Sequence, residues 1–333
     1  MDALPLRPPP LPRLSRADML RLTTVRNLPN LTKIPLFLGL MVAAGWVAWT
    51  TTSSVVLWTA YVALGYLWMG IVTFMHDGTH DTLFARPWLN TAFGVVAMIP
   101  IGVSFIAFQR DHLEHHRYNR SPRDPDAFTM GSRGFLDFLQ FYAYLLVGGV
   151  LTVLQFTIVY PIQKFDARAW RIHTLELLAR FVAIGAVLAL AAAHGVLGHV
   201  LALWLVPAYA FTLLNSMRFI GEHYGTPWEQ GQLLGTRTIT SHPLNSFFWN
   251  NINYHIGHHV YPATPWYNLQ KLHAALAPEI AARGAVVESS YLRVLWRSCV
   301  SGPESIERNE RQLAAHSAAN IPTASVSRTR GSA

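Results

Sequence analysis

The chain has 333 residues, of which 51% are hydrophobic and only 13% are charged. A soluble domain carries roughly twice that share of charged residues, so the composition excludes a protein whose whole surface faces water. The formal charge of +8 does not indicate nucleic-acid binding, because the arginines lie in the terminal segments and between apolar runs. The single cysteine, Cys299, excludes a disulfide framework and any multi-thiolate metal site within the chain.

The two ends differ in composition from the centre. Residues 1–34 are rich in proline and arginine and lack the apolar core and cleavage site of a cleavable signal, so we interpret them as a cytosolic arm. Residues 301–333 show little apolar periodicity, cannot offset the entropy of ordering, and are predicted to form a disordered tail. Residues 35–300 then form one membrane domain.

Six apolar segments follow one another along this domain, and several reach the roughly 20 residues that span a hydrocarbon core. They are residues 35–50, 55–75, 89–108, 135–160, 177–193 and 197–217. Pro100 and Gly102 interrupt the third segment, and Gly148 and Gly149 interrupt the fourth. We therefore expect these two to dip into the membrane or lie along its surface, which leaves four crossings.

Four crossings place both tails and every histidine motif on one side of the membrane. The two loops left on the other side, residues 50–54 and 194–199, contain no Lys or Arg, as the positive-inside rule expects of outer loops. We predict an all-α integral membrane fold with about four transmembrane helices, re-entrant or interfacial helices and a cytosolic histidine-rich cap. Both termini are predicted to be cytoplasmic.

Nine of the fifteen histidines fall into four clusters. They are His76 and His80 in HDGTH, His112, His115 and His116 in HLEHH, His223 after Glu222, and His255, His258 and His259 in HIGHH. On a helix, residues i, i+3 and i+4 lie on one face, so each cluster can present its rings to one small volume. So many neutral imidazoles without a cation would have too few donors for their acceptors, and the pattern therefore predicts metal binding.

The number of ligands indicates two metal ions. Structural zinc takes four ligands and catalytic zinc takes three and a water, whereas nine histidines supply two ions with four or five each. Imidazole suits zinc, copper, iron and nickel, so the residues alone leave the metal open. Four neighbouring polar residues are candidates for hydrogen bonds behind the ligands. They are Asp77, Asp126, Glu222 and Asn251. For Asp126, in Asp124-Pro125-Asp126, a simple turn is the alternative.

The order of the motifs resembles that of the membrane fatty acid desaturase family. It runs through HDGTH, HLEHHRYNRSPRDPD, NSMRFIGEH and NINYHIGHHVYP, with a trailing LQKLH, over about residues 35–280. The resemblance implies a non-haem di-iron centre (Fe2+/Fe3+), held by the eight box histidines and by His223, on the cytosolic side. This centre would itself be the catalytic group and would use O2 to introduce a double bond into a lipid-linked or thioester fatty acyl chain.

Electrons for such a reaction must reach the metal from outside the chain. The sequence contains no GxGxxG fingerprint, no P-loop and no His-Pro-Gly-Gly stretch like that of a fused b-type cytochrome, so no bound nicotinamide or flavin is expected. The resemblance implies an external ferredoxin or b-type cytochrome. The basic cytosolic face could attract such an acidic donor, although the same charge also sets topology.

Two other functions remain open from the sequence. A hydroxylase or ketolase of the same scaffold, acting on a lipid or a carotenoid, would need the same nine histidines. A metal-binding membrane transporter would place its ligands along a path at membrane depth, whereas these clusters follow the ends of apolar segments.

Overall fold

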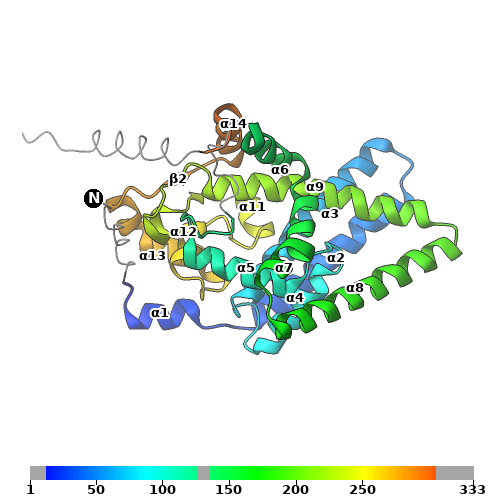
Figure 1. The fold of residues 1–333 in the computed structure, drawn as a ribbon, viewed down its shortest axis with the longest axis horizontal. Coiled ribbons are helices and arrows are strands. Elements are labelled where there is room, and N and C mark those ends of the chain that lie inside the picture. Colours follow the sequence, from blue (N-terminus) through cyan, green and yellow to red (C-terminus); the bar gives the residue numbers. More distant parts are fainter. Residues whose placement is uncertain (1–12, 127–134, 305–333) are drawn as a thin grey trace, which may run out of the picture.

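The computed structural model describes residues 13–126 and 135–304, and the fold is almost entirely helical (Figure 1). The amino-terminal part contains α1 (Arg16–Thr23), α2 (Leu28–Thr50), α3 (Ser54–Thr79), α4 (Pro87–Met98) and α5 (Phe105–Tyr118). The central part contains α6 (Phe135–Leu154), the π-helix η2 (Gln155–Val159), α7 (Tyr160–Lys164), α8 (Ala167–Ala193) and α9 (Leu197–His223). The predicted tail beyond residue 304 lies outside the described residues.

After α9 the chain forms a compact cap of short elements. They are α10 (Gly231–Leu234), β1 (Thr238–Ile239), α11 (Pro243–Phe248), α12 (His255–Val260), η3 (Trp266–Asn268), α13 (Leu269–Ala282), β2 (Val287–Glu288) and α14 (Tyr291–Ser301). The strands β1 and β2 pair in parallel, with Thr238 opposite Val287. Ile256 and Val260 of α12 are buried against Leu272 and Leu276 of α13, and this packing fixes the helix that carries the third histidine motif.

Two helical hairpins, α2–α3 and α8–α9, form the part of the molecule that faces lipid. Their closed ends lie at the same end of the molecule (Figure 1), where the rings of Trp49 and His199 are 5.3 Å apart. Gly195 has a φ of +69°, which ends α8 because a residue with a side chain is strained in this left-handed conformation. The outer faces expose apolar side chains such as Val42 and Phe181, which favour lipid over water.

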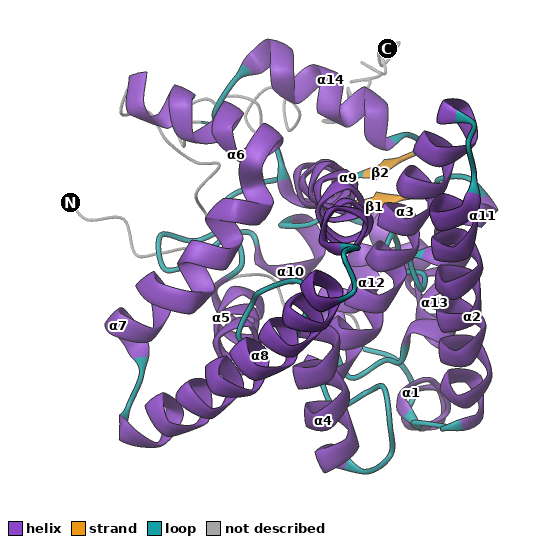
Figure 2. Cartoon of the chain, turned by 90° about the vertical axis from the view of Figure 1, so that its right-hand side faces the viewer, coloured by secondary structure: helices purple, strands orange, loops and turns teal. Residues whose placement is uncertain are grey.

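Five helical stretches are long and apolar enough to cross a membrane, one more than the four predicted crossings. The additional stretch, Phe138–Lys164, runs across the long axis of the molecule, whereas α9 runs along it and is seen almost end-on in Figure 2. Val147 interrupts its helical geometry with φ −127° and ψ 22°. Its direction favours the predicted placement along the membrane surface.

The third apolar segment is broken, as predicted. The helix α4 has 12 residues and ends at Met98, and α5 begins only at Phe105. Between them Gly102 adopts a φ of +84°, a conformation that glycine tolerates best. The break turns the chain so that α5 lies against the end of α3. The all-α membrane fold is therefore confirmed, and it places the first two histidine motifs side by side.

The terminal segments take part in the fold further than the predicted boundaries imply. Within the arm of residues 1–34, Leu22 joins the core of the cap, and Asn30 accepts a hydrogen bond from the indole of Trp266 at 2.7 Å. At the other end Glu304 is buried and forms an ion pair with Arg120 at 2.8 Å. Both ends of the described chain thus pack against the side of the molecule that carries the histidines.

Candidate metal centre

The nine predicted histidines come together at one place, although they lie on four separate segments. His76 lies in the last turn of α3 and His80 directly follows this helix, while the second cluster lies on α5. His223 is the last residue of α9, and the third motif forms α12. Eight of the rings are buried and that of His80 is half-buried. The local i, i+3, i+4 spacing therefore produces one convergent set of ring nitrogens.

The rings form two groups. In the first group, five ring nitrogens lie within 4.8 Å of one another. They belong to His76, His80, His112, His116 and His258. In the second group, ring nitrogens of His115, His223 and His259 also lie within 4.8 Å of one another. His255 belongs to this group because its ring nitrogen lies within the same distance of His223 and of a carboxylate oxygen of Glu222. The division into five and four imidazoles matches the predicted supply of ligands for two ions.

The distances between the rings fit metal binding. The Nε2 atom of His112 lies 3.0 Å from Nε2 of His80 and 3.1 Å from Nε2 of His116. The Nε2 atoms of His223 and His255 are 3.0 Å apart. Two imidazole nitrogens bound at right angles to one ion, at 2.0–2.1 Å each, would be about 3.0 Å apart. Both ring nitrogens of His76 are buried without a hydrogen-bond partner in the described structure. A cation shared with neighbouring rings would satisfy the one of these two nitrogens that carries the lone pair.

Several of the histidine rings lie outside the membrane-spanning helices, and burial keeps most of these rings neutral. It lowers the pKa of His80 to about 3, with a further contribution from the charge of His115. The pKa values of His112 and His258 are also lowered well below the usual value, mainly by burial and then by neighbouring histidines. Neutral imidazole is the form that donates its lone pair to a metal, so this environment favours a cation over protons.

His115 is the exception, because carboxylates surround it. Its Nδ1 lies 2.9 Å from Asp124 Oδ1 and 3.6 Å from Asp126 Oδ2. Burial alone would lower the pKa of His115, but the two carboxylates together with Asp111 outweigh it and raise the pKa to about 9. A carboxylate behind a ligand histidine fixes the orientation of the ring and makes it a stronger donor.

The Asp124-Pro125-Asp126 segment serves both as a turn and as a partner of a histidine. Asp124 accepts hydrogen bonds from the backbone N–H groups of Arg120 at 2.8 Å and Asp126 at 3.0 Å, which close the turn. The same carboxylate faces His115. The structure therefore assigns the closer contact to Asp124, whereas the sequence singled out Asp126.

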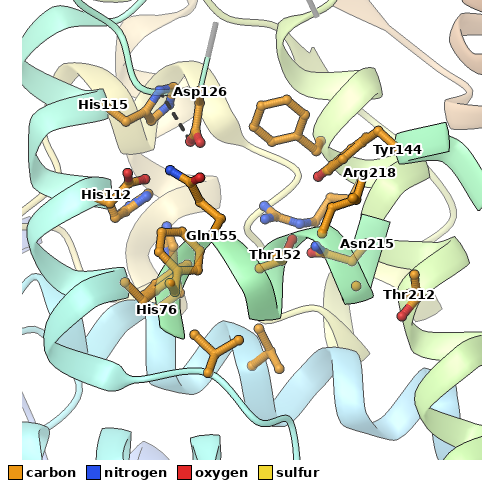
Figure 3. Close-up of a pocket in the computed structure, with 18 of the residues that line it drawn as sticks. His76, His112, His115, Asp126, Tyr144, Thr152, Gln155, Thr212, Asn215 and Arg218 are labelled. Atoms are coloured by element: carbon orange, nitrogen blue, oxygen red, sulfur yellow. Dashed lines mark ion pairs between the residues drawn. The ribbon is translucent and has the colours of Figure 1, made fainter. Parts of the chain in front are cut away.

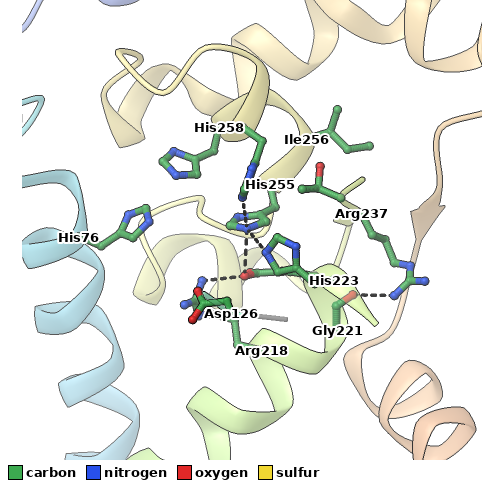
Figure 4. A network of polar contacts seen from close by, with 12 residues as sticks. His76, Asp126, Arg218, Gly221, His223, Arg237, His255, Ile256 and His258 are labelled. Atoms are coloured by element: carbon green, nitrogen blue, oxygen red, sulfur yellow. Dashed lines mark hydrogen bonds and ion pairs between the residues drawn. The ribbon is translucent and has the colours of Figure 1, made fainter. Parts of the chain in front are cut away.

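Glu222 lies directly beside the second group of rings. Its Oε2 is 2.7 Å from Arg218 Nη1 and 3.5 Å from His255 Nε2 (Figure 4), and its Oε1 accepts from the Tyr291 hydroxyl at 3.2 Å. The carboxylate can therefore orient His255 or supply an oxygen to the same ion. The outer role predicted for Glu222 would use this contact with His255.

Asp77 and Asn251 hold the loop that follows the third motif. Asp77 Oδ2 accepts from the backbone N–H of Trp266 at 3.0 Å, and its Oδ1 is 3.8 Å from His76 Nδ1. Asn251 donates its amide to the carbonyl of Trp266 at 3.1 Å. The predicted contact of Asn251 with a ligand is replaced by a contact with this loop, because α12 begins only at His255 and the i, i+4 spacing does not apply.

Two neighbours of the histidines carry no signal in the sequence. The Oε1 of Gln232 accepts a hydrogen bond from His259 Nδ1 at 3.0 Å, so this ring nitrogen carries the proton, and the side-chain NH2 of Gln232 donates to the carbonyl of His116. Phe108 stacks on the ring of His112, with centroids 5.5 Å apart. Only the fold brings these residues to the rings.

A cavity of about 530 Å3 opens beside the histidines (Figure 3). Apolar side chains such as Val72, Met98 and Phe156 form much of its wall, and His76, His112, His115, His223 and His255 line one side. This volume lies in the range of small-molecule sites. A bound hydrocarbon would reach the metal groups from this cavity.

Comparison with known proteins identifies the family of this chain. The family model described as "Fatty acid desaturase" matches residues 52–291. A sphingolipid delta(4)-desaturase/C4-monooxygenase of Bos taurus is 29% identical, over 82% of this chain and 86% of its own length. An sn-1 oleoyl-lipid 12-desaturase of Arthrospira platensis is 26% identical, over 69% and 71%. The resemblance inferred from the histidine motifs is thus confirmed: the chain belongs to the fatty acid desaturase family.

Proposed function

We propose that this oxidoreductase is an O2-dependent, di-iron membrane desaturase that introduces a double bond into the acyl chain of a lipid. One observation carries the proposal: nine imidazoles converge in groups of five and four, and five of these rings line a largely apolar cavity. The names of the relatives, which are desaturases of sphingolipids and of oleoyl-lipids, support a lipid as the substrate.

The chemistry explains why the site needs a metal. An unactivated methylene group has neither an acidic proton nor a leaving group, so side-chain acids and bases cannot break its C–H bond. A bound iron pair would supply the redox chemistry, because it can reduce O2 with electrons from a donor. Two hydrogens from the chain, two electrons and two protons convert one O2 into two waters. The residues of the chain hold the ions, exclude bulk water and position the hydrocarbon, and small displacements redirect the reaction.

The number of rings supports iron over structural zinc. A structural zinc site takes four ligands, whereas nine imidazoles in groups of five and four converge here. Imidazole is also a ligand that suits iron. Metal analysis of the purified protein should find about two irons per chain.

We place the histidines and both termini in the cytoplasm. The closed ends of the two hairpins carry no Lys or Arg, whereas the opposite side carries nearly all the positive charge, which supports this orientation. An acidic ferredoxin or b-type cytochrome would then meet a basic face. Labelling tests the orientation: in a Cys299→Ser background, an impermeant maleimide on intact cells should label Ser53→Cys and should not label an introduced cysteine at Ser121.

Lipid analysis tests the reaction. The intact chain and a His258→Ala variant are expressed in a host of defined lipid and pigment content, and the lipids are compared by mass spectrometry. Loss of two hydrogens from acyl chains that depends on His258 supports desaturation. A gain of oxygen would support the hydroxylase alternative, which the C4-monooxygenase in the names of three relatives makes a specific second candidate. Exchangeable zinc without O2 consumption would support a transporter.

A further inference from the structure

Part of the cavity beside the rings is polar, although a plain hydrocarbon segment needs no polar partners. Its polar side chains include Asp111 on α5, Thr152 near the end of α6, Gln155 at the start of η2, and Asn215 and Arg218 on α9. Figure 3 labels the last four of these. This polar wall lies on the same cavity as His112 and His115, so its partner would sit close to the reacting carbons.

Asp111 provides an acceptor that is aimed at the cavity and has no partner. The residue is 2% exposed, and its Oδ1 is buried without a hydrogen bond in the described structure. Leaving a buried oxygen unpaired is unfavourable, so native structures rarely retain such a group without a partner. A ligand that donates an O–H or N–H would satisfy it.

Gln155 provides a second polar group from the opposite wall. It is the first residue of the π-helix η2, and such insertions into α-helices often occur at functional sites. His173, a buried residue, donates to the carbonyl of Thr157 at 3.2 Å and so braces this irregular turn. The side-chain amide of Gln155 makes no hydrogen bond within residues 13–126 and 135–304, and it extends toward the side where His112 and Asp126 lie (Figure 3).

The positive charges at this end of the cavity already have carboxylate partners. Arg218 pairs with Glu222 at 2.7 Å, and Asp126 lies 3.6 Å from His115. A phosphate group of a ligand would therefore meet no unpaired cation from these residues. An uncharged group that both donates and accepts hydrogen bonds fits the wall better.

We propose that the cavity selects a lipid with a hydroxyl or amide group within a few carbons of the bond that reacts. Asp111 accepts a hydrogen bond from this group, and Gln155 binds it from the other side. This inference rests on the proposed desaturase function and narrows its substrate class. A site built to hydrogen-bond a polar group discriminates strongly against a substrate that lacks it, because its buried groups are then unpaired.

Two substrates of equal chain length test the proposal: an N-acyl long-chain amino alcohol and a phosphatidylcholine. The iron-loaded protein is supplied with a reductase and ferredoxin, and products are measured by mass spectrometry. The wild-type protein should prefer the amino-alcohol lipid at least about tenfold. Gln155→Leu should reduce this preference about tenfold. The matched control is Gln163→Leu, which removes an exposed amide from the same helical stretch and should keep the wild-type ratio.

Iron content and ligand-induced thermal stabilisation are measured in the same proteins. Equal turnover of the two lipids, a preference for phosphatidylcholine, or an unchanged ratio in Gln155→Leu would overturn the inference while leaving the desaturase function intact. If the wild-type protein converts neither lipid, the proposed function fails and stabilisation decides the inference. Stabilisation of the wild-type protein by the amino-alcohol lipid, lost in Gln155→Leu and kept in Gln163→Leu, supports it; equal stabilisation of all three proteins refutes it.

Discussion

Replacing Asp124 by Asn is expected to weaken one of the two metal positions selectively. The carboxylate accepts three hydrogen bonds, from His115 Nδ1 at 2.9 Å and from the backbone N–H groups of Arg120 and Asp126 at 2.8 and 3.0 Å. An asparagine has one oxygen, so its NH2 group must face a donor on one side. The variant therefore loses both the negative charge behind His115 and one hydrogen bond.

The size of the effect follows from the role of the carboxylate. Loss of a hydrogen-bond partner behind a metal ligand typically costs about 10–100-fold in metal affinity or activity. Each factor of ten corresponds to about 1.4 kcal/mol, so the expected loss is about 1.4–2.8 kcal/mol. The loss of affinity should affect the ion held by His115, His223, His255 and His259. The five rings of the other group keep all their neighbours.

Chelator titration followed by elemental analysis measures this effect. At a chelator concentration that leaves about two irons on the wild-type protein, Asp124→Asn should retain about one. Asp166→Asn is the matched control. Asp166 is exposed and caps α8 by accepting from Ala169 N–H at 2.7 Å, a task that asparagine performs equally well. Equal iron retention by Asp124→Asn and the control would refute the proposed arrangement.

Three more predictions concern packing, the carboxyl terminus and pH. Gly149→Ala should destabilise the protein by about 1–3 kcal/mol, because the added carbon would lie 2.2 Å from Thr212 Oγ1, whereas Gly185→Ala, in open space, should not lower the Tm. Truncation after residue 304 should preserve the Tm in detergent. Removal of Glu304 as well should cost about 3–5 kcal/mol, because it breaks the buried ion pair with Arg120. In metal-free protein, the raised pKa of His115 stabilises the fold below about pH 6.5, and this contribution is lost as the pH rises through about 9. The difference in Tm between the wild-type protein and Asp124→Asn should therefore shrink over that range. A constant difference in Tm would contradict this prediction.

Local spacing predicts the convergence of the histidines well, because the second and third motifs each form on a helix of their own. His112, His115 and His116 share one face of α5 wherever that helix packs, and the same holds for the third motif on α12. The long apolar runs likewise predict the two hairpins. These features depend on neighbours in sequence, so they can be read before the fold is known.

The contacts behind the ligands depend on the backbone between the elements. Arg120 has a φ of +56°, and the turn that follows brings Asp124, rather than Asp126, closest to His115. Asn250 and Asn251 also adopt positive φ values, so the helical spacing assumed for Asn251 does not apply. Such single-residue conformations leave no periodic pattern, and sequence spacing therefore misassigns the partners.

The direction of the fourth apolar segment is decided by tertiary packing. Its hydropathy suffices for a crossing, yet Gly148 and Gly149 lie against Ser216 and Thr212 of α9, so the two helices approach closely where they cross. The composition of a helix indicates how much of its surface can face lipid. It does not determine the angle at which the helix crosses its neighbour. The angle matters, because it places Gln155 on the cavity.

Contacts between the cap and α3 couple the assembly of the metal centre to the membrane helices. Asn250 donates to the carbonyl of Gly70 at 2.9 Å and to the hydroxyl of Thr73 at 2.8 Å, and Asp77 holds the Trp266 loop. These bonds lie on the helix that ends in the first histidine motif, so contacts that need no ion help to dock the third motif against the first. The polar contacts between α3 and the cap thus help to orient the neutral histidine rings toward one another. Bound ions would complete this arrangement.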